Sequence, residues 1–180
     1  MTQLTQEKRI NIVRGEWRVS ADANVYLSTI LGSCVAACIR DPDAKIGGMN
    51  HFLLPGGTGR AGGPEMERYG VHLMELLIND LLKSGAQRNR LEAKLFDGAH
   101  VVPGLSDIGR QNVDFAEKFL RDEGIRVTGG SVRGPAGRKV EFWPASGRAR
   151  QMLLTKEQLP SETRMAPAPA PVSSGNVELF

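Results

Sequence analysis

Cysteine and aromatic residues are scarce in this 180-residue sequence, which has two cysteines and an aromatic fraction of 6%. Two cysteines four positions apart, Cys34 and Cys38, do not indicate a disulfide scaffold, and so low a count suits a reducing compartment. The few aromatic residues do not interleave with basic residues as a stacking platform for nucleic acid requires. We therefore expect neither a disulfide-rich secreted domain nor a nucleic-acid partner.

Long apolar segments are also missing. The sequence contains no run of about 18 apolar residues of the kind that forms a transmembrane helix. Its first ten residues, MTQLTQEKRI, lack the apolar core of a secretory signal. We therefore expect a cytoplasmic protein that does not insert into a membrane.

The composition that is present is that of a globular domain. The hydrophobic fraction is 41% and the charged fraction 24%, both ordinary for a chain with one hydrophobic core. The formal net charge is +3, and residues 131–150 carry five basic residues against one acidic residue, Glu141. Such a surface can attract an acidic partner, although a solvated surface explains the same pattern.

The last twenty-one residues differ in character from the rest. From Pro160 onward the sequence is rich in proline, alanine and serine and offers little to bury. We predict a folded domain over residues 1–159 and a flexible tail over residues 160–180.

Hydrophobic periodicity predicts more strands than helices. Residues 65–83 have apolar side chains at helical spacing, followed by Gly85 as a helix C-cap, and residues 109–122 form a second amphipathic pattern. The inward face of the first helix is predicted to hold Met66, Tyr69, Leu73, Leu77 and Leu81. Strands are predicted at 9–13 and 16–20 around a turn at Gly15, and at 24–31, 34–40, 46–54, 91–96, 125–132, 138–143 and 148–154. This order indicates an α+β or layered α/β sandwich, with mixed β-sheets flanked by two main helices.

One cysteine stands where a strand breaks. Cys34 follows Gly32 and Ser33, and a turn there would present the thiol at a strand tip and expose backbone N–H groups that can stabilise an oxyanion. A thiol needs a nearby base to act as a nucleophile. His51 lies seventeen residues later in a strand-like run, and a turn at residues 41–45 would make the two strands neighbours. This pairing indicates a Cys34–His51 site.

The pattern alone leaves other roles open. Cysteine is often an inert core residue, and an apolar strand can bury a histidine without catalytic purpose. In a strand, Cys34 and Cys38 lie about 13 Å apart at roughly 3.3 Å per residue, which is too far for a disulfide or a shared metal. We therefore place Cys38 in the core. A helix instead would bring the two together and permit a zinc site.

The remaining candidates lie before the cysteine and along the chain. Ser28 or Thr29 can supply a hydroxyl that orients the imidazole, but only one of two successive strand residues points at the site. His72 is expected on the wet face of the first helix, and His100 in a loop is a weaker base.

Several segments together resemble one known family, the chemoreceptor glutamine deamidases, CheD. The matching stretches are residues 31–55 (LGSCVAACIRDPDAKIGGMNHFLLP), 68–70, 85–99, 107–112 and 137–147. Cys34 matches the family nucleophile and His51 the family histidine. The family places a threonine shortly before the cysteine; counting back without a gap gives Ser28, and Thr29 is its neighbour. Asp97 stands where the family loop usually has a glycine.

The resemblance implies a fold, a reaction and partners. The fold is a layered one related to a cysteine-dependent toxin domain that deamidates glutamine. The reaction is hydrolysis of receptor glutamine side chains to glutamate through a thioester, without metal or cofactor, on cytoplasmic receptor helices. The alternative is a non-catalytic adaptor that binds receptors or stimulates a CheC-type phosphatase. Residues 176–180 (NVELF) partly resemble a receptor-terminal pentapeptide, so they are a candidate docking tether, or else a chance ending.

Overall fold

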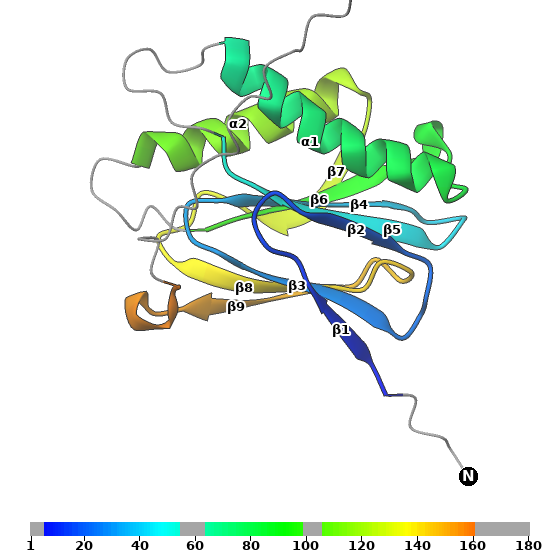
Figure 1. Cartoon of the computed structure of the whole chain (residues 1–180), viewed down its shortest axis with the longest axis horizontal. Coiled ribbons are helices and arrows are strands. Elements are labelled where there is room, and N and C mark those ends of the chain that lie inside the picture. Colours follow the sequence, from blue (N-terminus) through cyan, green and yellow to red (C-terminus); the bar gives the residue numbers. More distant parts are fainter. Residues whose placement is uncertain (1–5, 55–63, 99–105, 161–180) are drawn as a thin grey trace, which may run out of the picture.

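Two β-sheets and a pair of helices form three layers in the computed structural model, which describes residues 6–54, 64–98 and 106–160. Helices α1 (Pro64–Lys83) and α2 (Ser106–Asp122) lie on one face of a five-stranded sheet, and a four-stranded sheet lies on its other face (Figure 1). The predicted layered α/β sandwich with mixed sheets and two main helices is confirmed.

Both sheets mix parallel and antiparallel pairs. The five-stranded sheet has the order β2-β5-β4-β6-β7, in which only β6 and β7 are parallel. The four-stranded sheet has the order β1-β3-β8-β9, in which only β1 and β3 are parallel. The strands are β1 (Lys8–Asn11), β2 (Trp17–Ser20), β3 (Val25–Leu31), β4 (Val35–Asp41), β5 (Ile46–Phe52), β6 (Glu92–Asp97), β7 (Arg126–Ser131), β8 (Gly137–Phe142) and β9 (Ala149–Leu154); two short 3₁₀ helices span Arg88–Arg90 and Lys156–Gln158.

The turn at Gly15 joins two sheets and not two paired strands. The backbone N–H of Ile12 bonds to the carbonyl oxygen of Ser28 on β3 at 2.8 Å, and the N–H of Gly15 bonds to the carbonyl oxygen of His51 on β5 at 2.7 Å. Gly15 has a φ of 86°, a conformation that glycine adopts without steric cost. The chain therefore crosses from the four-stranded to the five-stranded sheet within a few residues.

Helix α1 buries the predicted face over its last three turns and departs from it near its start, where Met66 is half-buried. Leu73, Leu77 and Leu81 are buried as expected, but Tyr69 is 40% exposed and Gly70 is buried in its place. A Cβ on Gly70 would lie 2.6 Å from the Phe115 ring of α2, so the two helices approach too closely there for a larger side chain. Tyr69, about 100° away around the helix, is turned outward.

Both helices end on a glycine in the left-handed conformation. At the end of α1 the N–H of Ala86 bonds to Leu81 O and that of Gly85 to Leu82 O, and Gly85 has a φ of 106°. At the end of α2 the N–H of Ile125 bonds to Leu120 O and that of Gly124 to Arg121 O, and Gly124 has a φ of 69°. These are Schellman motifs, and the predicted cap at Gly85 is confirmed.

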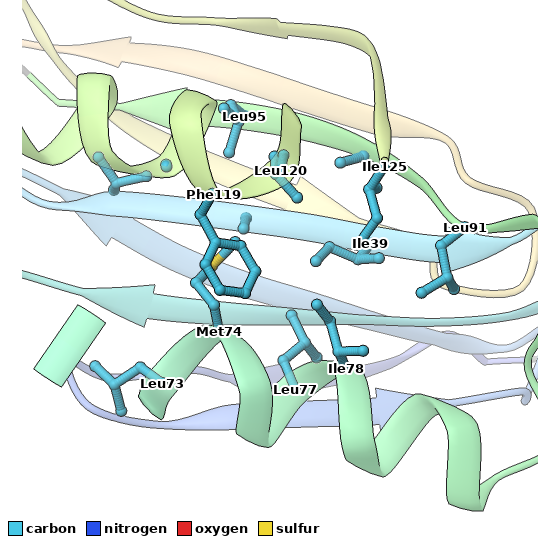
Figure 2. Close-up of a cluster of buried hydrophobic side chains, with 14 of the residues drawn as sticks. Ile39, Leu73, Met74, Leu77, Ile78, Leu91, Leu95, Phe119, Leu120 and Ile125 are labelled. Atoms are coloured by element: carbon cyan, nitrogen blue, oxygen red, sulfur yellow. The ribbon is translucent and has the colours of Figure 1, made fainter. Parts of the chain in front are cut away.

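Two hydrophobic clusters lie between the layers. The first fills the space between the helices and the five-stranded sheet, where Figure 2 shows Leu77 and Ile78 of α1 and Leu120 of α2 packed near Ile39 of β4. The second lies between the sheets and contains Leu27, Leu31, Met49 and Phe142 together with Cys34. The predicted site therefore sits at the edge of the inter-sheet core.

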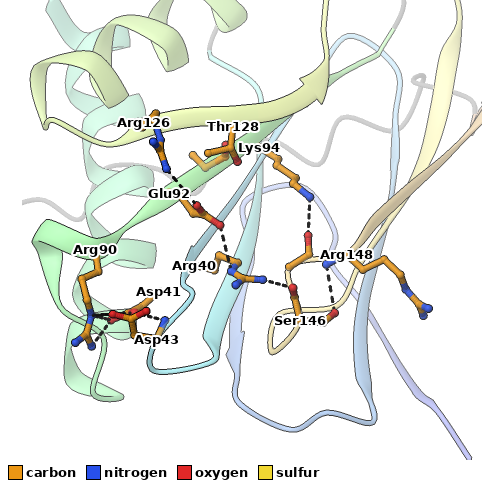
Figure 3. Close-up of polar contacts among 12 residues, drawn as sticks. Arg40, Asp41, Asp43, Arg90, Glu92, Lys94, Arg126, Thr128, Ser146 and Arg148 are labelled. Carbon is orange, nitrogen blue, oxygen red and sulfur yellow. Dashed lines mark hydrogen bonds and ion pairs between the residues drawn. The ribbon is translucent and has the colours of Figure 1, made fainter.

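Polar contacts fasten the sheets at the end of β4 (Figure 3). The guanidinium of Arg40 donates to the carbonyl oxygen of Ser146, and Lys94 Nζ donates to that of Gly147 at 2.7 Å. Both carbonyls belong to the loop between β8 and β9, so side chains of the five-stranded sheet hydrogen-bond to a loop of the four-stranded sheet.

Asp41 organises the turn that follows β4. Its buried carboxylate accepts hydrogen bonds from the Arg90 guanidinium at 2.7 Å and from the backbone N–H groups of Gln87, Asp43 and Ala44. Burial alone would raise the pKa of Asp41, but these hydrogen bonds outweigh it and lower that pKa to about 2. The ionised carboxylate is therefore the form that the fold stabilises.

We expect Asp41→Asn to reduce the free energy of unfolding by about 2 kcal/mol at pH 7, the equivalent of a shift from 3.8 to about 2. Because the pKa is lowered in the folded state, this stabilisation is present above pH 4 and is lost as pH falls towards 2. Urea unfolding at a series of pH values measures it. A difference between wild type and variant that does not shrink between pH 4 and 2 would contradict this assignment.

Candidate active site

Cys34 lies at the third place where the chain crosses between the sheets, after the crossings that follow β1 and β2. Leu31 ends β3 of one sheet and Val35 begins β4 of the other, so residues 32–34 span the gap. Cys34 is buried, with 7% of its surface exposed. Its carbonyl oxygen accepts a hydrogen bond from the N–H of Gly98 at 3.1 Å. The predicted break at Gly32 and Ser33 is thus a sheet-to-sheet crossing.

Strand register places His51 beside this thiol. β4 and β5 are antiparallel neighbours, and Ala36 is paired with His51. Cys34 precedes Ala36 by two residues, so alternation along the strand puts Cys34 and Ala36 on the same face. Cys34 and Ala36 both belong to the inter-sheet cluster, so this face points towards the four-stranded sheet, and His51, as the partner of Ala36, shares it. Cys34 and His51 are therefore diagonal neighbours, for which about 7–8 Å between Cα atoms is usual.

A hydroxyl from the opposite sheet fixes the imidazole. Thr29 Oγ1 lies 2.8 Å from His51 Nδ1 and 2.6 Å from the carbonyl oxygen of Ile12. A carbonyl only accepts, so the single hydroxyl proton goes to Ile12 and Oγ1 must accept from Nδ1–H. The Ile12 carbonyl also lies 3.5 Å from Nδ1, which fits the same proton position. The neutral ring therefore keeps its lone pair on Nε2.

Ser28 does not share this position. It is buried beside Thr29 on β3, but successive strand residues point to opposite faces, and residues 25, 27 and 31 share the inter-sheet face with residue 29. The two hydroxyls that the sequence left as alternatives are thus separated: the structure brings Thr29 to the imidazole.

The environment keeps His51 neutral. Burial lowers the pKa of His51 to about 4; the hydrogen bond to Ile12 opposes this shift, and the positive charge of Arg14 adds to it. Nε2 is buried without a hydrogen-bond partner among the described residues. At neutral pH the ring is therefore an unprotonated base whose free nitrogen is available to a reacting group.

The other candidates fall outside this arrangement. Cys38 is buried on β4, and burial raises the pKa of its thiol far above the ordinary range, which makes it a core residue. His72 is exposed on α1, as predicted, and His100 lies outside the described residues. Within the described residues no three His, Cys, Asp or Glu side chains gather closely enough to hold a metal ion.

Asn112 is a polar residue near the site that the sequence did not single out. Its side chain is fully buried on α2; Nδ2 donates to the carbonyl oxygen of Ser33 at 3.0 Å, and Oδ1 accepts from the N–H of Leu54 at 2.9 Å. One amide therefore ties the turn before Cys34 to the end of the chain segment that carries His51. Its only sequence signal was a place in the family-like stretch 107–112.

We expect Asn112→Asp to slow alkylation of Cys34 by iodoacetamide by about tenfold, because a carboxylate keeps the bond to Leu54 but cannot donate to Ser33. Asn50→Asp is the matched control. Asn50 is buried on β5, its Oδ1 accepts from Ala37 N–H at 3.0 Å, and its Nδ2 contacts the Met74 sulfur at 3.3 Å. Both variants bury a charge, so equal alkylation rates in the two would show that Asn112 has no positioning effect.

The protein is thus a layered α/β sandwich with a cysteine–histidine site. The cysteine lies at a turn between the sheets, and a buried hydroxyl holds the neutral histidine. The chain belongs to the CheD family: the family model described as CheD chemotactic sensory transduction matches residues 53–152, and full-length relatives agree. None of the helices in the described part of the chain has the length and hydropathy to span a bilayer.

The relatives are similar over almost their whole length. Proteins of Agrobacterium fabrum, Acidiphilium cryptum and Caulobacter vibrioides strain NA1000 are 57%, 58% and 55% identical to this chain. Each comparison covers 96% of this chain, and 97%, 94% and 93% of the respective relative. All three are named probable chemoreceptor glutamine deamidases. Among solved structures, a DUF152-family protein of Neisseria meningitidis matches 73% of this chain and 65% of its own, with 11% identity and a TM-score of 0.46.

Proposed function

We propose that this protein is a chemoreceptor glutamine deamidase, a hydrolase that converts receptor glutamine side chains to glutamate and releases ammonia. The relatives that carry this name share 55–58% of their residues with it. The observation that carries the proposal is the buried Thr29–His51 hydrogen bond at 2.8 Å. This bond leaves Nε2 as an oriented base on the inter-sheet face of the five-stranded sheet, the face on which Cys34 also lies. Receptor cytoplasmic helices are the substrate, and the cytoplasm is the site of action.

In the proposed reaction Cys34 is the nucleophile and His51 the general base and acid. Nε2 takes the thiol proton, and the sulfur attacks the amide carbon; backbone N–H groups at Gly32 and Ser33 stabilise the oxyanion. The imidazolium then donates its proton to the departing ammonia, leaving a thioester. Water, deprotonated by Nε2, cleaves the thioester to glutamate and restores the thiol. The balance is amide plus water to acid plus ammonia, without cofactor.

Thr29 is the positioning residue in this scheme, because its hydroxyl receives the Nδ1 proton and holds the ring. We expect Thr29→Val to lower kcat by about ten- to a hundredfold with little change in KM, and Thr29→Ser to restore most of the loss. Ser28→Ala is the matched control and should leave kcat within about twofold. If Ser28→Ala has the larger effect, the assignment of the orienting hydroxyl is wrong.

Mass spectrometry of a purified receptor cytoplasmic fragment tests the proposed function. Incubation with the protein should add about 1 Da at particular glutamines and release one ammonia for each. If a panel of receptor fragments gains no mass while the protein remains folded and its Cys34 thiol remains alkylatable, the deamidase proposal is wrong and the adaptor role takes its place.

Partner binding remains a separate prediction. An adaptor that stimulates a CheC-type phosphatase would keep that effect in a Cys34→Ala variant, whereas a deamidase would lose its activity. The terminal segment 176–180 lies outside the described residues, and its docking to the receptor array stays a prediction. If deletion of those five residues leaves binding to every array component unchanged, the tether is ruled out.

A further inference from the structure

A pocket of about 490 Å³ opens next to the Thr29–His51 pair. Its walls come from β1 and the crossing after it, from residues 28–30 of β3, from His51 of β5, from Lys139 of β8 and from Pro160. The lining includes Thr29 and Ile12, which both contact Nδ1 of His51, and does not include Cys34. The reacting amide, which must approach Nε2 and Cys34, would lie beside the pocket and not inside it.

The rim of this pocket is positively charged. Arg9, Arg14 and Lys139 line it, and the lining includes no carboxylate. Lys139 Nζ lies 3.0 Å from the carboxylate of Glu141, which also pairs with Arg150. Arg9 and Arg14 are exposed, and neither forms an ion pair with a described residue. Among the residues that the structure describes, no carboxylate pairs with these two cations of the rim.

Arg14 stands close enough to influence the site. After burial and the hydrogen bond to Ile12, its charge is the third factor acting on the pKa of His51, and it lowers that pKa. The apolar residues Ile12, Val13 and Ile30 also line the pocket. A ligand that combines a carboxylate with a short aliphatic stem, such as a glutamate or aspartate side chain, matches both features.

We infer that this pocket binds an acidic side chain of the receptor substrate that lies within one helical turn of the glutamine to be deamidated. The inference rests on the proposed function and adds a specificity rule to it. Residues three or four apart on a helix are about 5–6 Å apart, and His51, a diagonal neighbour of Cys34, lines the pocket. A helix with its glutamine at Cys34 can therefore set a neighbouring carboxylate at the mouth of this pocket. Receptor glutamines flanked by Asp or Glu are then the preferred targets.

A double comparison of enzyme and substrate charges tests the inference. The substrate is a receptor cytoplasmic fragment whose modified glutamine has Asp or Glu within four residues, and the same fragment with those acids changed to alanine. The enzymes are wild type, the rim variant Arg9→Gln/Arg14→Gln, and the control variant Arg121→Gln/Arg126→Gln. The control removes the same charge from exposed positions at the end of α2 and on β7. Initial rates of ammonia release give kcat/KM.

The rim variant should lose roughly tenfold in kcat/KM on the acidic fragment, since two exposed ion pairs are each worth up to about fivefold. The loss should appear in KM, shrink as salt is added, and fall below about twofold on the alanine fragment. The control should match wild type on both fragments. Equal losses by the rim variant on both fragments, or no loss on either, would overturn the inference while deamidation itself stands. Absence of ammonia release by wild type would overturn the proposed function and this inference together.

Discussion

Replacing His51 with glutamine is expected to lower receptor deamidation by about a thousandfold, within the range that general acid–base groups supply. Glutamine approximates the size of imidazole but cannot take the thiol proton or return it to ammonia. A thiol without a base is mostly protonated at neutral pH and attacks amides poorly. Ammonia release from a receptor fragment gives the rate, and His72→Gln, on the exposed face of α1, is the matched control.

The acid limb of the pH profile is part of the same prediction. Because the pKa of His51 is lowered to about 4, the base form persists well below pH 6.5, and kcat/KM should fall only as pH drops through about 4. The same shift makes His51 a source of stability that is present above pH 6.5 and lost towards pH 4. His51→Gln should therefore lose less stability than wild type between those values. Equal activity of His51→Gln and His72→Gln would remove His51 from the mechanism.

The second large effect is expected from Gly98→Ala. A Cβ at this position would lie 1.4 Å from the carbonyl oxygen of Gly32 and 2.3 Å from its carbon. Backbone atoms cannot rotate away, so the turn that carries Cys34 must shift, and the bond from Gly98 N–H to Cys34 O must break or stretch. Displacement of a nucleophile by about 1 Å costs on the order of a hundredfold in rate, and the overpacking costs about 1–3 kcal/mol of stability.

Gly129→Ala controls for the change of residue type. A Cβ there would meet only the Lys94 side chain, at 3.8 Å or more, so activity and stability should stay close to wild type. Comparing kcat, Cys34 alkylation and urea unfolding of the two variants isolates the steric effect at the turn. A Gly98→Ala variant with wild-type kcat would show that the turn tolerates a side chain and that its position matters little.

Local sequence patterns predicted the strands and helices because the hydrophobic periodicity of each element lies within its own residues. The strands and both helices lie where alternation and helical spacing placed them, and the spacing between Cys34 and His51 made them neighbours once β4 and β5 paired. What the patterns missed depends on contacts between distant segments. Tyr69 was placed inward because the close approach of Gly70 to Phe115 is invisible along one helix.

At the site, too, local patterns do not predict contacts between distant segments. Counting back from Cys34 without a gap gave Ser28 as the orienting hydroxyl, with Thr29 as its neighbour. The two hydroxyls are distinguished only in the assembled sandwich, where the inter-sheet face of β3 carries Thr29 to His51. The contacts of Asn112 with Ser33 and Leu54 join residues 79 and 58 positions apart. No local periodicity encodes them, so they emerge only from the packing of α2 on the five-stranded sheet.

The most direct test of the account compares two cysteine variants in the receptor deamidation assay. Cys34→Ala and Cys38→Ala each remove one buried thiol, and unfolding curves establish that both are folded. We predict that Cys38→Ala still adds about 1 Da at the same receptor glutamines as wild type, while Cys34→Ala adds none. A folded Cys34→Ala variant that deamidates the fragment at the wild-type rate would contradict the assignment of Cys34 as nucleophile.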